Sequence, residues 1–207
     1  MDTLIFAVLL CVGAILRLGL ALIYRSRRKH YANVLQGLGF DPVKVPELRV
    51  ALVHCQPSFF RFKSIFFRGC FNGAELVFFD FWGNHWNFSS LPVVALKLSD
   101  SKIPAFRFTT GSNPLFLLEG YTQKDDVVLA SAPHFSINHI LRSPDRQGVT
   151  ALFSQKVIEF FNKNSEWSVE TNSRWMLVYA RRGFTRFDLT AARDIFEKAL
   201  QIRQFFS

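Results

Sequence analysis

The amino-acid sequence predicts an α+β protein: one N-terminal transmembrane helix, then a twisted antiparallel sheet with helices packed on one face. Three observations predict this class. An apolar run of 21 residues lies near the N-terminus, at 4–24. Short aromatic and β-branched segments separated by turn signals fill the middle of the chain, and amphipathic segments with helical spacing fill its last third. We therefore divide the chain into a transmembrane helix (1–24), a basic juxtamembrane helix (25–42) and a cytoplasmic α+β domain (43–207).

The apolar run has the length of a membrane span. As a helix it measures about 31 Å, at about 1.5 Å per residue, which matches the hydrocarbon thickness of a bilayer. A cleaved signal peptide carries its positive charges before the apolar run, whereas here Asp2 precedes the run and the positive charges follow it. We therefore expect the segment to be retained as a membrane anchor.

A basic cluster follows the span directly and predicts its orientation. Because Lys and Arg accumulate on the cytoplasmic side, the N-terminus is expected outside and the folded domain in the cytoplasm. The same side chains would face anionic lipid headgroups at the membrane surface. They are Arg25, Arg27, Arg28 and Lys29.

One face of the predicted span carries mostly small side chains, on which another membrane helix can approach closely. The predicted helix–helix contact consists of Ala7, Cys11, Ala14, Leu18 and Ala21, with Arg17 at its flank. Three interpretations of Arg17 stay open. It snorkels to the cytoplasmic headgroups, it pairs with a polar group of a neighbouring protein, or the helix is short and only partly inserted.

The juxtamembrane segment has a helical pattern of apolar residues that ends at Gly39 and Pro42. Beyond Pro57 the pattern changes to strands, with Asn72-Gly73 as a hairpin turn. Their close spacing predicts antiparallel pairing, because parallel pairing needs crossover helices. The expected strands lie within 59–69, 74–83, 92–100, 103–110 and 126–131.

The last third is expected to fold as helix, hairpin and helix. A first helix covers 148–164, two strands around the turn at 172–173 follow, and an amphipathic helix covers 188–206.

The aromatic stretch "FFDFWGNHW" has two interpretations. In the first it is a strand whose alternate residues pack on both faces, with Asp80 capping the turn at Gly83-Asn84. In the second it is an exposed patch that docks a partner, since aromatic residues are enriched in interfaces. The candidate docking residues are Phe79, Phe81, Trp82 and Trp86.

Charge and cysteine content argue against several function classes. The formal net charge is +9, but residues 25–68 carry nine Lys and Arg against two acidic residues, so the excess is juxtamembrane rather than spread over a nucleic-acid-binding face. The three cysteines have no CxxC spacing, so we expect Cys55 and Cys70 to be reduced residues of the core, although they could pair.

No catalytic, nucleotide-binding or metal-binding motif is present, so the sequence predicts no enzyme, no cofactor and no metal. The weaker candidates are His134 with His139 as loop ligands of a metal, His54, Cys55, Cys70 and His85 meeting across a hairpin, and Asp80 with Glu166 or Glu170 as an acid/base pair.

Three segments carry a family resemblance: "GCFNGAELVFFDFWG", "LPVVALKLSDSKIPAF" and "HFSINHILRSPDRQGVTALFSQKVIEFFNKNSEWSVETNSRWMLVYARR". Over most of 28–205 the chain resembles a group of bacterial single-pass membrane proteins with no assigned activity. The resemblance implies an accessory role at a bacterial inner membrane, and it supplies no catalytic residue.

The sequence thus favours a non-catalytic, single-pass accessory subunit that packs onto a larger integral-membrane complex of respiratory or photosynthetic type. Two alternatives remain. The first is a membrane-tethered enzyme or small-ligand sensor with a pocket lined by His54, Asp80, His85 or Glu170. The second is a regulator that binds anionic lipid surfaces through residues 25–29.

Overall fold

The computed structural model describes residues 2–45, 66–82, 90–98, 103–110, 122–172, 174–180 and 187–206, with some side chains of the first helix and of the strand ends left aside. The elements are α1 (Asp2–Gln36), β1 (Asp41–Val43), β2 (Phe66–Phe71), β3 (Ala74–Trp82), β4 (Ser90–Lys97), β5 (Arg107–Thr110), η1 (Gln123–Asp125), α3 (Pro133–Asn138), β6 (His139–Arg142), α4 (Arg146–Leu152), α5 (Gln155–Lys163), β7 (Trp167–Thr171), β8 (Trp175–Ala180) and α6 (Leu189–Gln204).

One eight-stranded sheet organises these elements, in the order β1-β2-β3-β4-β8-β7-β5-β6. Every described strand pair is antiparallel, so the predicted mixed class and the antiparallel pairing are confirmed. The turn between β2 and β3 is the predicted one. Asn72 and Gly73 have φ of 49° and 78°, and a two-residue type I′ hairpin turn requires positive φ at both of its central residues.

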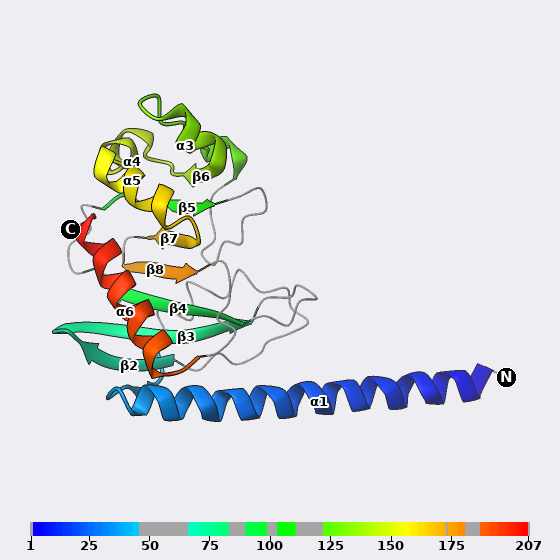
Figure 1. The fold of residues 1–207 in the computed structure, drawn as a ribbon. Coiled ribbons are helices and arrows are strands. Elements are labelled where there is room, and N and C mark those ends of the chain that lie inside the picture. The colour runs from blue at the N-terminus through cyan, green and yellow to red at the C-terminus, as the bar shows by residue number, and fades with distance from the viewer. Residues whose placement is uncertain are drawn as a thin grey trace.

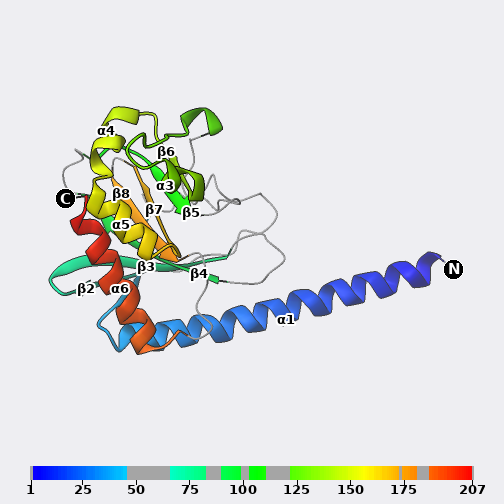
Figure 2. The same ribbon diagram turned by 45° about the horizontal axis from the view of Figure 1, so that its top comes forward.

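The two faces of the sheet bury different sets of residues. On one face, Phe78, Val94 and Phe108 pack in a large apolar core with buried residues of α1, α4, α5 and α6. Figures 1 and 2 show α5 and α6 lying over the strands, with the end of α1 beside α6. On the other face, a smaller apolar cluster extends across β2, β3, β4 and β8 and includes Phe79 and Leu177.

The end of α1 is part of the larger core. Leu35 and Phe40 are fully buried, and the Phe40 ring stacks on Phe196 of α6 with centroids 4.7 Å apart. The same ring lies over Gly69 of β2, where a Cβ atom would come within 2.5 Å of its carbons. A glycine at this position therefore lets the ring pack directly on the strand backbone.

Several expected element boundaries were wrong. Residues 126–131 do not form a strand: Asp126 makes an isolated bridge to Arg142, and the chain then turns into α3. The expected helix at 148–164 is interrupted at Phe153, which leaves the helical conformation and packs against Phe106 and Phe108.

Two strands and a helix were not foreseen. Residues 41–43, expected at the end of the juxtamembrane helix, form β1, and the helix itself ends at Gln36. Residues 133–142, expected as a loop, form α3 and the edge strand β6.

Among the described residues, no helix is both long enough and apolar enough to cross a membrane.

We expect Gly69→Ala to lower the free energy of unfolding by about 1–3 kcal/mol, because the added methyl group forces the buried Phe40 ring out of its stack with Phe196. Urea unfolding followed by tryptophan fluorescence measures the change. Cys70→Ala, at the next and exposed position of β2, is the matched control and should be close to neutral. If Gly69→Ala and the unsubstituted chain had equal free energies of unfolding, the packing of the Phe40 ring on Gly69 would not contribute to stability.

Candidate functional site: the projecting helix

Helix α1 extends beyond the rest of the protein. Figures 1 and 2 show its C-terminal end lying beside β2 and α6 while the N-terminal part extends away from the sheet. Burial follows this division, because Tyr31 is the first buried residue among those whose side chains are described in α1. The described side chains of α1 on its N-terminal side are exposed or half-buried.

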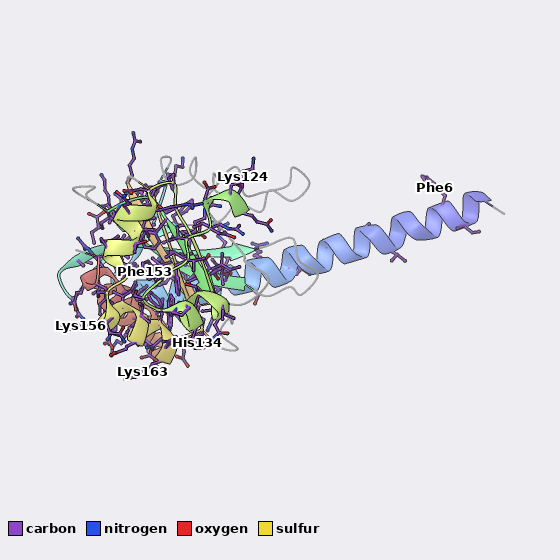
Figure 3. The ribbon with its side chains drawn as sticks, turned by 90° about the horizontal axis from the view of Figure 1, so that it is seen from above. Phe6, Lys124, His134, Phe153, Lys156 and Lys163 are labelled. Atoms are coloured by element: carbon purple, nitrogen blue, oxygen red, sulfur yellow. The ribbon has the colours of Figure 1, made fainter. Side chains whose placement is uncertain are left out.

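Large apolar side chains on this projecting part are exposed. Among them, Phe6 and Leu18 are each 65% exposed and Leu22 is 59% exposed; Figure 3 shows Phe6 far from the rest of the protein. Burying one such side chain contributes about 1.5–3 kcal/mol. A helix that presents several of them indicates a surface for lipid or for another protein rather than for water.

The exposed side chains change from apolar to cationic just before the helix reaches the sheet. Arg25, Arg28 and Lys29 are exposed, and we call these three residues the basic collar. The side chain of Arg27 lies outside the described set. The order along α1 is therefore an apolar arm, then the basic collar, then the buried end.

Contacts with distant parts of the chain hold the buried end. The His30 Nε2 atom lies 2.5 Å from the carbonyl oxygen of Phe187, which lies two residues before the start of α6. The Tyr31 ring packs on the Phe187 ring with centroids 4.3 Å apart and on the Phe78 ring of β3 at 5.7 Å. The collar is thus held at a fixed place relative to β3 and α6.

The predicted helix–helix face is only partly described. Ala14 and Leu18 are exposed, so the described part of this face makes no contact that buries it. The side chains of Ala7, Cys11, Arg17 and Ala21 lie outside the described set.

The predicted aromatic docking patch has a different outcome. Phe79 is fully buried in the smaller apolar cluster and packs on Phe66 with centroids 5.2 Å apart, so its ring is not on a surface. Phe81 and Trp82 end β3, and their side chains are not described. Trp86 lies outside the described residues, as do Gly83 and Asn84, to which the capping interpretation of Asp80 refers.

The sheet register separates the proposed acid/base pair. Glu170 lies opposite Leu177, which lies opposite Ala95, and Ala95 lies opposite Val77. Because neighbouring residues of a strand point to opposite faces, Asp80 belongs to the other face from Val77 and therefore from Glu170. Asp80 and Glu170 cannot act on one substrate atom.

Glu170 instead belongs to a buried polar cluster that sequence reasoning missed. The Tyr179 hydroxyl donates a hydrogen bond of 2.6 Å to Glu170 Oε1, and Arg107 Nε lies 3.5 Å from Glu170 Oε2. Thr109 and Ser168 hydroxyls meet nearby at 2.9 Å. All five residues are buried, so this cluster ties β5, β7 and β8 together beneath the surface. Alternating polar residues in β5 (Arg107 and Thr109) and in β7 (Ser168 and Glu170) were the sequence signal for it.

Glu166 lies at an open cavity of about 680 Å³ between the start of β7 and α6. Its lining is Asn164, Glu166, Trp167, Ala180, Asp194, Glu197, Lys198 and Gln201. Lys198 Nζ donates to Asn164 Oδ1 at 3.1 Å and to Gln201 Oε1 at 3.2 Å, so the cation is held across the cavity by neutral oxygens. Neither Asp80 nor Glu170 lines it, and His54 and His85 lie outside the described residues.

The two histidines of "PHFSINH" occupy different environments. His134 is exposed, whereas His139 is buried between aromatic rings, with its Nδ1 atom 2.8 Å from the carbonyl oxygen of Phe135. Burial lowers the pKa of His139, and the hydrogen bond to Phe135 opposes that shift. No group of three His, Cys, Asp or Glu side chains suited to hold a metal ion occurs in the part of the chain that the structure describes.

Comparison with known proteins adds a fold relationship. No family model matches the chain, and no curated protein matches it in sequence. Among solved structures, the crystal structure of the mycobacterial trehalose monomycolate transport factor A, TtfA, is similar, with a TM-score of 0.53 and 12% identity. The match covers 84% of this chain and 89% of that chain, so it includes most of the α+β arrangement. At this level of identity the likeness shows a shared fold alone.

We expect the protein to lose stability as the pH falls from about 7 to about 5, partly through His139. Its pKa is lower in the folded state than the value of about 6.5 in the unfolded chain, so the unfolded state takes up a proton first as the pH drops. In His139→Gln this part of the pH dependence disappears, as urea unfolding at several pH values would measure. His134→Gln, at an exposed position, should keep the full dependence; an unchanged dependence in His139→Gln would contradict the assignment.

We expect Tyr179→Phe to lower the free energy of unfolding by about 1.5–3 kcal/mol, because a buried carboxylate loses a hydrogen-bond donor. The double variant Tyr179→Phe, Glu170→Gln tests the coupling: its cost should be clearly smaller than the sum of the two single costs. Additive costs, measured by chemical unfolding, would mean that the hydroxyl and the carboxylate act independently.

Proposed function

We propose that this protein is a non-catalytic, single-pass accessory subunit of an integral-membrane complex. The observation that carries the proposal is the arm of α1, where large apolar side chains are exposed on a helix that extends away from the sheet. The sequence of residues 4–24 supports a bilayer as its surroundings, because 21 predominantly apolar residues match the hydrocarbon thickness.

The basic collar supports the orientation. In a span at residues 4–24, Arg25, Arg28 and Lys29 lie at the headgroups, and the positive-inside rule places them in the cytoplasm. The N-terminus is then outside the bacterial cytoplasmic membrane and the sheet is inside. We propose that the collar contacts anionic lipid headgroups. The exposure of its three cations is equally compatible with the alternative of a lipid-surface regulator.

Two features favour a protein partner over an isolated anchor. The face with Ala14 and Leu18 is exposed and mostly small, as suits close helix packing, and Arg17 lies deep enough in the span to gain from a polar partner. The alternative of a tethered enzyme receives less support, because Asp80 and Glu170 lie on opposite faces of the sheet.

The host complex has two candidates. A respiratory or photosynthetic complex is the one that the sequence favours. The second is an assembly for trehalose monomycolate transport, a role that the name of the structurally similar protein suggests, although at 12% identity the likeness itself is one of fold alone. In either host this chain contributes contacts rather than a reaction.

Purification of the tagged full-length chain from bacterial membranes in a mild detergent tests the proposal. We expect an integral-membrane protein to be recovered with it at a constant ratio through two successive purification steps. Recovery of the chain as a monomer without companions, under conditions that keep other membrane complexes intact, would overturn the subunit assignment.

We expect Arg17→Leu to leave membrane insertion intact but to reduce recovery of the partner several-fold, because a polar contact in hydrocarbon is lost. Quantitative mass spectrometry of the purified material measures the ratio, and carbonate extraction measures insertion. Lys163→Leu removes a cation from an exposed position of α5, far from the arm, and is the matched control. An unchanged ratio in Arg17→Leu would favour a snorkelling arginine.

A further inference from the structure

We infer that α1 is a rigid arm that fixes the height and the rotation of the α+β domain relative to whatever holds the N-terminal half of the helix. The inference rests on the proposed function only for the nature of those surroundings. The last turns of α1 are buried in the core of the domain, and the helix is continuous from these turns to the exposed N-terminal half.

The helix is continuous through the collar. It runs from Asp2 to Gln36, 35 residues, or about 52 Å at 1.5 Å per residue. The sequence between Gly19 and Gly37 contains neither Gly nor Pro, the residues at which helices most often bend. Exposed apolar residues, basic collar and buried end therefore share one helix axis.

Three parts of the domain hold the buried end. The Tyr31 ring packs on Phe78 of β3 and on Phe187 before α6, and His30 Nε2 lies 2.5 Å from the Phe187 carbonyl oxygen. Beyond the helix, Phe40 is fully buried over Gly69 of β2 and against Phe196 of α6. Rotation of α1 about its axis would break the ring contacts, and sliding along its axis would pull Phe40 out of the core.

The return of the chain from helix to strand is short and hydrogen-bonded. The backbone N–H groups of Leu38 and Phe40 both donate to the Leu35 carbonyl oxygen, at 3.0 and 2.9 Å. Gly39, with φ of 80°, makes this reversal possible. The helix end is thus closed by its own backbone as well as by the core.

A fixed rotation decides which face of the arm is accessible. At about 100° per residue, the line through Ala14, Leu18 and Arg25 lies about 100° around the helix from the direction of Tyr31 and Leu35, which point into the domain. A helix that packs on Ala14 and Leu18 therefore lies beside the domain and reaches the basic collar without meeting the sheet. A partner that turns or tilts the arm moves the domain with it.

Distance measurements between two spin labels test the inference on the full-length chain in lipid nanodiscs, without any partner. One label replaces Leu18 on the arm and the other Lys156 on α5; a pair within the domain, at Lys124 and Lys163, gives the reference width. All four positions are exposed, and noncanonical amino acids carry the labels so that the cysteines stay in place. We expect the arm-to-domain distribution to be as narrow as the reference.

Two insertions after Lys29 test whether the width of the distance distribution depends on an unbroken helix. Four alanines should shift the distance and leave the distribution narrow, because they extend and rotate the helix by about 6 Å and about 40°. Gly-Gly-Ser should broaden it severalfold. A distribution in the unmodified chain as broad as that of the Gly-Gly-Ser variant would overturn the inference. Because no partner is present, a narrow distribution together with failed co-purification would instead count against the proposed function.

Discussion

The packing of the Phe40 ring between Gly69 of β2 and Phe196 of α6 is the contact on which the rest of the arrangement depends. It joins the N-terminal helix, an outer part of the sheet and the C-terminal helix at one point. Tyr31 and Leu35 belong to the same buried core as the residues of α5 and α6. The large core is therefore incomplete without the end of α1. This end cannot leave the core without exposing apolar surface to water.

The second face of the sheet is built differently from the first. At one end it is apolar, from β2 to β8; at the other, Arg107 and Glu170 are directly opposed on β5 and β7. Glu170 has no exposed surface, and Tyr179 donates to it. A carboxylate held in this way links strands, because its charge is balanced inside the sheet and solvent does not reach it.

Sequence patterns predicted the elements that have their own strong signals. Asn72-Gly73, the aromatic strand at β3 and the amphipathic α6 each depend on local spacing. The missed elements α3 and β6 are too short to show a period, and the break at Phe153 depends on ring contacts with distant Phe106 and Phe108. The separation of Asp80 from Glu170 depends on the register across four strands, which no local pattern contains. The collar was predictable from composition, whereas its fixed position was not, because Phe187 and Gly69 are far away in the chain.

The distance between the end of the predicted span and the first buried residue constrains the kind of partner. From Tyr24 to Tyr31 the helix rises about 10 Å, a few ångströms more than the depth of one headgroup layer, which is about 5–8 Å. With residues 4–24 in the bilayer, the rigid end of α1 therefore holds the domain against the membrane surface, with no flexible linker that could let it reach further from the membrane. A partner of the domain must then come equally close to the bilayer. A protein that is itself embedded in the membrane meets this condition, and it also offers helices to the exposed face at Ala14 and Leu18.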